Sequence, residues 1–153
     1  MKFVATEDIA APIEFVWSRI SDLETFERRA RKRVGTIERR PPGPAGKGTT
    51  WSGTAEVMGK RRDVTVTLAE VAAPETMAMT AVTDGMDVDI GVVLSRQGPR
   101  LTRMTVTSEA KARSLAARLM LQSAKLARQT LAKRYKGRVA NFAASVEDAS
   151  RRA

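Results

Sequence analysis

The segment MDVDIGVVL, residues 86–94, decides the fold class of this chain, because its even-numbered positions are all apolar while Asp87, Asp89 and Gly91 stand between them. Successive side chains of a β-strand point to opposite faces of its sheet, so a period of two gathers the apolar side chains on one face. The segment therefore predicts a strand that buries one face and turns the other to solvent.

The segments around residues 86–94 repeat the same period of two. They are joined by short turn sequences such as Asp84-Gly85 and Ala73-Pro74-Glu75, which are typical of connections between antiparallel neighbours. No crossover helix interrupts the strands between residues 49 and 108, so we expect an antiparallel meander and not a parallel α/β sheet. The other alternating segments are residues 50–57, 64–68, 77–81 and 102–106.

A helical period replaces the strand period from about residue 112 and continues for some 35 residues. We expect one long terminal helix with a bend at Gly137, and with Arg118, Lys125 and Lys136 together on its outer face. Leu115, Leu119 and Leu126 are expected to widen the inner seam in the first half. The seam itself runs through Met120, Ala124, Ala127, Leu131, Tyr135, Val139, Phe142 and Val146.

Two short helices are predicted near the start of the chain. A strand over residues 3–9 stops before Pro12, and Ile13, Val16, Trp17 and Ile20 then follow the spacing of an amphipathic helix. Asp22 can cap a second helix over residues 23–32, with Leu23 and Phe26 as its inner contacts. A strand over residues 34–39 and a stiff proline-rich loop over residues 41–46 lead into the meander.

The N-terminal stretch Ile9-Ala10-Ala11-Pro12-Ile13-Glu14-Phe15-Val16-Trp17, followed by Ile20-Ser21-Asp22-Leu23, resembles the opening signature of the START-related SRPBCC superfamily. This superfamily includes polyketide cyclase/dehydrase-like proteins. The order of elements agrees with its helix-grip fold, an α+β arrangement with two short helices between strands 1 and 2. We therefore expect a single domain over residues 1–153, in which a curved antiparallel sheet of about six or seven strands wraps around a long C-terminal helix.

The resemblance also implies a ligand site. Members of the superfamily typically enclose a hydrophobic cavity between the sheet and the terminal helix, and they range from lipid or hormone carriers to cyclases. The leading hypothesis is therefore binding or transport of a hydrophobic small molecule, such as a lipid, an isoprenoid or a polyketide-like compound. A fold of this kind does not identify the molecule.

The expected contacts are large, adaptable side chains on the inner faces. Trp51 stands beside the small residues Gly53 and Ala55, which leaves space next to its ring, and inward methionines can mould around varied apolar ligands. The hydroxyl of Tyr135 could hydrogen-bond a polar end of the ligand. A filled core remains the alternative for the same residues. The candidate ligand contacts are Trp51, Met77, Met79, Ile90, Met104, Met120, Leu131 and Tyr135.

The absence of cysteine and histidine removes thiolate nucleophiles, imidazole bases, disulfides and the usual zinc sites. We therefore name no catalytic residue and expect neither a metal nor another cofactor. An aromatase/cyclase-type enzyme remains the alternative function, with Arg103 and Tyr135 as its candidate groups, although it would lack a base suited to neutral pH. Asp87 and Asp89 share a strand face whose opposite side is apolar, so they are expected to face solvent.

The excess of basic over acidic residues indicates anionic partners. The chain has 27 basic and 17 acidic residues, and two runs hold 16 of the basic ones. Seven lie between Arg28 and Arg40, and nine between Lys111 and Arg138, where no acid occurs. A third hypothesis is thus a module that docks on an anionic membrane surface or an acidic protein. We do not expect nucleic acid, because the basic runs lack interleaved aromatic residues. With no signal peptide and no membrane-spanning run, a cytoplasmic location is expected.

Overall fold

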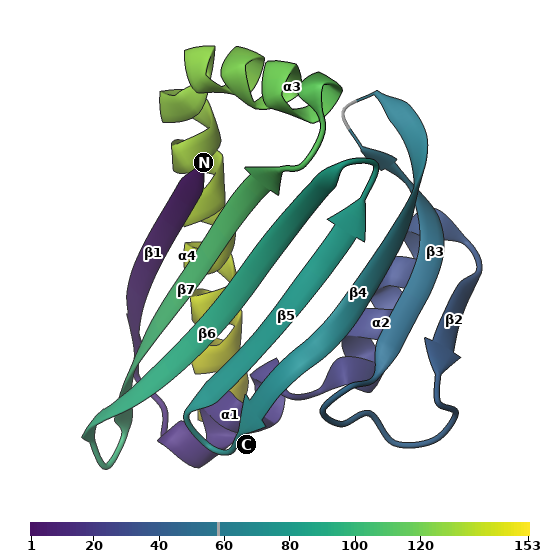
Figure 1. Ribbon diagram of the computed structural model, residues 1–153. Helices are drawn as coiled ribbons and strands as arrows, with labels where there is room; N and C mark the ends of the chain where they lie inside the picture. Colours follow the sequence, from purple (N-terminus) through teal and green to yellow (C-terminus); the bar gives the residue numbers. More distant parts are fainter. Residues whose placement is uncertain (58) are drawn as a thin grey trace.

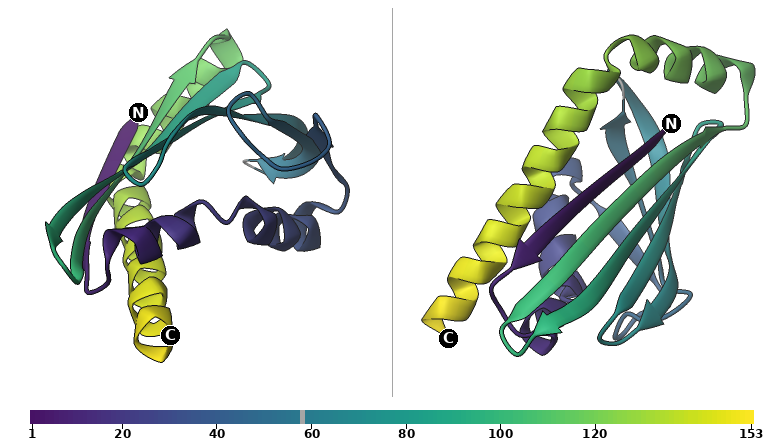
Figure 2. Two further views of the ribbon diagram at one scale, coloured as in Figure 1. Left: turned by 90° about the horizontal axis from the view of Figure 1, so that it is seen from below. Right: turned by 90° about the vertical axis from the view of Figure 1, so that its left-hand side faces the viewer.

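The computed structural model describes residues 1–57 and 59–153 and shows a seven-stranded antiparallel sheet with α1, α2 and α4 on one side (Figures 1 and 2). Its α+β helix-grip architecture confirms the expected fold class. In chain order the elements are β1 (Lys2–Ile9), α1 (Ile13–Ile20), α2 (Leu23–Val34), β2 (Ile37–Arg40), β3 (Thr50–Val57), β4 (Lys60–Ala72), β5 (Thr76–Thr83), β6 (Met86–Gly98), β7 (Leu101–Ala112), α3 (Leu115–Leu126) and α4 (Arg128–Arg152).

The strand order β1-β7-β6-β5-β4-β3-β2 makes the first two strands of the chain the two edges of the sheet. Strands β2 to β7 form the expected meander, in which each strand pairs with the next. The chain must therefore cross the whole width of the sheet between β1 and β2. Helices α1 and α2 make this crossing on the inner side (Figure 2).

Polar pairs occupy the outer face of the sheet, as the alternating pattern requires. Asp89 accepts a hydrogen bond from the hydroxyl of Thr80 at 3.1 Å, and Asp87 accepts one from the guanidinium of Arg113 at 2.9 Å. Asp89 is exposed and Asp87 is partly exposed. Both carboxylates are thus occupied by neighbours on the solvent side.

The main core lies beneath the β1–β7–β6 side of the sheet, where α1 and α4 pack. Ile9 of β1, Leu94 of β6 and Met104 of β7 are almost completely buried there with Val16 of α1 and Val146 of α4. Helix α4 makes its most extensive contacts with β1. The terminal helix therefore covers one side of the sheet and leaves the β2–β5 side to α2.

The terminal helical region differs from the prediction, because it breaks at Ala127 and not at Gly137. Helix α3 is anchored from its own start: Ser114 caps it, and Ala117 is fully buried. Ser114 also lies so close to the β5–β6 turn that a Cβ on Gly85 would collide with its hydroxyl. Since α4 is held separately on β1, the two helices follow different directions (Figure 2).

The break changes which residues share a helix face and which of them are buried. The placement of Leu115, Leu119 and Leu126 on the inner seam is wrong, because these side chains are 73%, 55% and 91% exposed. The prediction that Arg118, Lys125 and Lys136 share one outer helix face is wrong as well, because Lys136 lies on α4 whereas the other two lie on α3. Both corrections follow from the change of direction at Ala127.

Replacing Ile9 with alanine should lower the free energy of unfolding by about 2–5 kcal/mol, because a fully buried branched side chain is removed from the main core. Urea denaturation followed by circular dichroism measures the change. Val4→Ala is the matched control, since Val4 is 46% exposed on the same strand, and it should cost less than about 1 kcal/mol. Equal costs for the two variants would contradict this placement of the core.

Candidate functional site

A cavity of about 270 Å³ lies between α2 and the β2–β5 side of the sheet, and it is partly open to solvent. Its wall is almost entirely apolar, and Glu27 is the one charged residue among the described residues that line it. The lining residues are Leu23, Phe26, Glu27, Ala30 and Val34 of α2, Ile37 of β2, Trp51, Ser52, Gly53 and Ala55 of β3, Val64 and Val66 of β4, and Met79 of β5.

Local sequence determines how α2 covers this cavity. The side chain of Asp22 caps the helix by accepting a hydrogen bond from the backbone N–H of Thr25 at 3.2 Å. The apolar residues of α2 then recur at spacings of three and four, which places them on the face turned to the sheet. Gly35, with a φ of +79°, ends the helix after Val34. The expected strand start at residue 34 is therefore wrong, and β2 begins at Ile37.

A glycine also fixes the distance between α2 and β3. A Cβ at Gly53 would lie 3.1 Å from the backbone oxygen of Thr36, in the connection between α2 and β2. Any larger residue would push that connection away from the sheet. Gly53 therefore allows the end of α2 to approach β3 closely at one end of the cavity.

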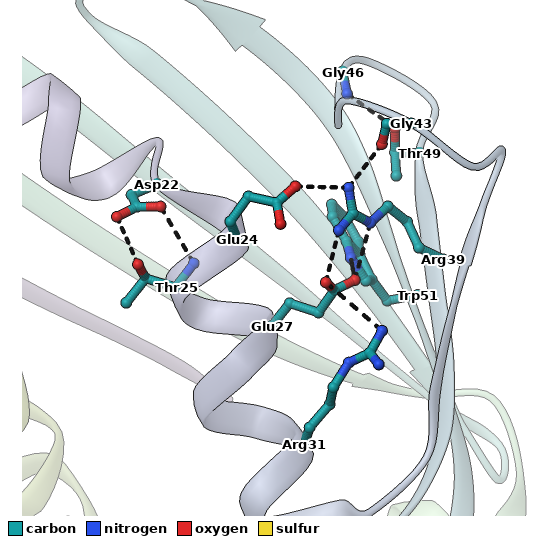
Figure 3. A network of polar contacts seen from close by, with 10 residues as sticks. All are labelled: Asp22, Glu24, Thr25, Glu27, Arg31, Arg39, Gly43, Gly46, Thr49 and Trp51. Carbon is teal, nitrogen blue, oxygen red and sulfur yellow. Dashed lines mark hydrogen bonds and ion pairs between the residues drawn. The ribbon is translucent and has the colours of Figure 1, made fainter.

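A polar network ties α2 to the strands at the wall of the cavity (Figure 3). Glu27 Oε1 accepts hydrogen bonds from Arg39 Nε and Trp51 Nε1, both at 3.0 Å, and Glu27 Oε2 accepts one from Arg39 Nη2 at 2.7 Å. Arg39 Nη1 in turn donates to Glu24 Oε1 at 2.9 Å and to the carbonyl oxygen of Gly43 at 2.7 Å. The network holds the indole of Trp51 in the cavity wall.

The electrostatics of this network favour the ionised form of Glu27. The hydrogen bonds from Arg39 hold the pKa of the Glu27 carboxyl below its ordinary value, against the opposing effect of burial. The same pairing raises the pKa of Arg39. The Glu27 side chain is 8% exposed, and Arg31 adds a longer ion pair at 3.7 Å. A carboxylate has about four acceptor positions, so these donors leave Glu27 little capacity for a further partner.

The cavity lies elsewhere than expected, since none of the described residues that line it comes from α3 or α4. The physical reason is the break at Ala127, after which α4 follows β1 and does not reach over β3–β5. Of the eight candidate contacts, Trp51 and Met79 line the cavity. Met77 and Met104 are buried, and Ile90, Met120 and Leu131 are partly buried outside it.

The two groups named for a cyclase-type reaction lie apart from this cavity. Tyr135 packs its ring against Phe3, with 5.6 Å between centroids, and its hydroxyl is 3.0 Å from that of Ser108. Arg103 pairs with Asp8 on the outer face, where Nε donates to Oδ1 at 2.9 Å. Neither Arg103 nor Tyr135 therefore lines the cavity.

Sequence reasoning misses Glu27 and Arg39, although both are central to the network. By sequence Arg39 belongs to a basic run, whereas in the structure its side chain is 17% exposed and ion-paired to Glu24 and Glu27. Other lining positions are absent from the candidate contacts, although the spacing in α2, which predicts Leu23 and Phe26 as inner contacts, and the alternation in β4 indicate them. Those positions are Leu23, Phe26, Ala30 and Val34 on α2, with Ile37, Val64 and Val66 on the sheet.

The remaining basic residues of α2 are exposed. Arg29, Lys32 and Arg33 line, together with Ala30, a second hollow on α2 that is open to solvent. None of the helices in the described part of the chain has the length and apolar composition needed to cross a bilayer.

Residues 1–147 match the family model described as polyketide cyclase / dehydrase and lipid transport. The chain belongs to this family. The match confirms the resemblance that the N-terminal residues indicated. No curated protein matches the chain in sequence.

Solved structures similar to this chain share its fold. A Thermus thermophilus protein has 19% identity and a TM-score of 0.64, with 98% of this chain and 99% of that one covered. The Zhui aromatase/cyclase from a Streptomyces species has 17% identity and a TM-score of 0.61, with 94% and 93% covered. A START superfamily protein from Mycobacterium smegmatis has 18% identity and a TM-score of 0.55, with 92% and 98% covered.

The network at the cavity wall predicts acid sensitivity. A carboxyl whose pKa is lowered by folding contributes stability above its unfolded-state pKa, and that contribution is lost as the pH falls through the folded-state pKa. Glu27→Gln should lower the free energy of unfolding at pH 7 by about 2 kcal/mol. It should also flatten the decline of stability below the ordinary glutamate pKa of 4.5. Urea titrations between pH 7 and pH 3 would measure both effects.

Glu24→Gln provides the matched control, because Glu24 contacts the same arginine from the same helix but its side chain is 64% exposed. It should change the free energy of unfolding by less than about 1 kcal/mol at pH 7. If the free energy of unfolding of Glu27→Gln declined with falling pH as steeply as that of the wild type, the assigned role of Glu27 would be contradicted.

Proposed function

We propose that this protein is a cytoplasmic binder of a hydrophobic small molecule, which it holds in the cavity beneath α2. The observation that carries the proposal is an apolar wall in which Glu27, the one charged residue among the described lining residues, is already paired with Arg39 and Trp51. Such a wall offers shape and apolar contact, not hydrogen-bonding groups. Family membership supports the proposal, since the family description includes lipid transport.

The volume limits the size of the ligand. A dry apolar cavity of about 150 Å³ is known to hold benzene, and the cavity here measures about 270 Å³. We infer a ligand portion of one or two rings, or an isoprenoid or polyketide-like group of similar bulk. Because the cavity is partly open, a longer lipid would place only its end beneath α2.

Binding is favoured over catalysis at this site. A general base must have a free lone pair aimed at the reacting proton, and its pKa should lie near the working pH. Glu27 meets neither condition, because its oxygens accept from Arg39 and Trp51 and its pKa is lowered. A cyclase-type activity therefore has no supporting group in the cavity wall among the described residues.

We infer that ligands enter the cavity beneath helix α2. None of its side chains is fully buried, in contrast to α1. It is held by the ion pairs of Arg39 and by the contact of Phe26 with Phe142 of α4, whose ring centroids are 6.2 Å apart. A small outward movement of α2 would widen the opening without disturbing the main core.

A neutral naphthylamine dye should bind the purified protein with micromolar affinity and gain fluorescence. A fatty acid or another apolar compound that fits the cavity should displace it. Ala55→Leu should weaken dye binding at least tenfold, because the added side chain fills part of the cavity. Fluorescence titration measures both constants.

Ala144→Leu is the matched control, since it adds the same side chain at an exposed position of α4. It should bind the dye as the wild type does. Unchanged affinity of a folded Ala55→Leu variant would overturn the assignment of the cavity. Failure of the wild type to bind any apolar probe would overturn the proposed function.

A further inference from the structure

Helix α3 presents three leucines to solvent. Leu115, Leu119 and Leu126, here called the α3 ridge, are each more than half exposed and include the most exposed large apolar side chain in the described part of the chain, Leu126 at 91%. Isolated apolar residues on a surface need no explanation, but three on one helical face do. Their alignment follows from spacings of four and seven residues, which are close to whole helical turns.

The orientation of the α3 ridge is fixed by the opposite side of the helix. At about 100° per residue, Ala117 lies half a turn away from Leu126, and Ala117 is fully buried. Met120, also on the inner side, has its sulfur 3.8 Å from a guanidinium nitrogen of Arg62 on β4. With its inner side held, α3 must keep the leucines pointing away from the sheet.

Basic side chains flank the α3 ridge. Arg118 and Lys125 are seven residues apart, so they lie together along one side of the leucines, and both are exposed. The sequence from Lys111 to Arg138 contains nine basic residues and no acidic one. An apolar ridge bordered by cations is the pattern of a helix that lies in the interface of an anionic membrane.

We propose that the α3 ridge docks on the surface of a bilayer that contains anionic phospholipid. The leucines would enter the boundary between headgroups and acyl chains, while Arg118 and Lys125 contact lipid phosphates. A second copy of the chain is a poor occupant, because the formal net charge of +10 and the local excess of cations would oppose the contact.

The arrangement of the molecule permits this contact. Figure 2 shows α3 at one extremity of the protein, across the end of the sheet and turned away from the direction of α4. A flat surface can therefore reach the α3 ridge. Arg62, whose guanidinium contacts Met120 of α3, pairs in register with Ala55 of the cavity wall, so β4 links α3 to the strand that lines the cavity. The docking surface itself does not depend on an occupied cavity.

Vesicle co-sedimentation tests the proposal with two sets of variants. Wild-type protein should bind phosphatidylglycerol/phosphatidylcholine vesicles in ~0.1 M salt and be released in ~0.5 M salt, where screening leaves a range of only a few ångströms. Exchanging Leu115, Leu119 and Leu126 for serine should weaken binding at least tenfold with no change of charge. Arg118→Gln with Lys125→Gln should also weaken it. The charge-matched control, Lys47→Gln with Arg100→Gln, should weaken it less.

A fluorescent label tests the orientation independently, because the chain has no cysteine to compete for labelling. An environment-sensitive dye on Ser123→Cys, beside the ridge on the exposed side of α3, should shift to the blue when anionic vesicles are added. The same dye on Ala144→Cys, exposed on α4, should not respond.

The proposal is overturned if the wild type fails to bind anionic vesicles at the lower salt concentration, or if the serine variant binds them as the wild type does. A concentration-dependent blue shift at position 123 without vesicles, together with dimer formation, would identify a second copy as the occupant and also overturn it. Because dye binding in the cavity is measured separately, failure at the membrane and failure of the proposed function are distinguishable.

Discussion

The constraint that shapes this protein is the width of the apolar inner face of its sheet. A one-sided antiparallel sheet must be covered on its apolar face, and a single helix about 10 Å across cannot cover seven strands. Helix α4 covers the β1 side, where the main core forms. The crossing from β1 to β2 supplies the second cover, because α1 and α2 run beneath the strands between the two edges. The cavity exists because α2 covers its part of the sheet less completely than α4 covers the other.

The ion pairs of Arg39 are what keep this second cover in place. None of the residues of α2 itself is buried, and the ion pairs of Arg39 with Glu24 and Glu27 join this helix to β2. A partly buried ion pair is stable only when its hydrogen-bonding groups are matched. Here the carboxylate of Glu27 meets two donors from Arg39 and one from Trp51, and the guanidinium of Arg39 also meets Glu24 and Gly43. The arrangement holds the indole in the cavity wall and leaves the Glu27 carboxylate little capacity to accept a hydrogen bond from a ligand.

The fold was predictable from sequence because its signals are local. The period of two in residues 86–94, the turn at Asp84-Gly85 and the cap at Asp22 each act within a few residues, and all appear in the structure. The position and the polar network of the site depend instead on contacts between residues that are far apart in the sequence. The break at Ala127 arises from two separate anchors, at Ser114 and on β1, and no glycine or proline marks it. The pairing of Glu27 with Arg39 joins a helix to a strand, so the basic run around Arg39 gave no sign of it.

The two edges of the sheet are closed to further strands by different means. Strand β1 pairs with β7 and packs against α4, whereas β2 contains only four residues, three of which are charged, and is followed by Pro41 and Pro42. Prolines lack the N–H that a neighbouring strand would need, and charged short edges resist pairing with other chains. At high local concentration, copies of this protein are thereby hindered from pairing through the β2 edge into aggregates.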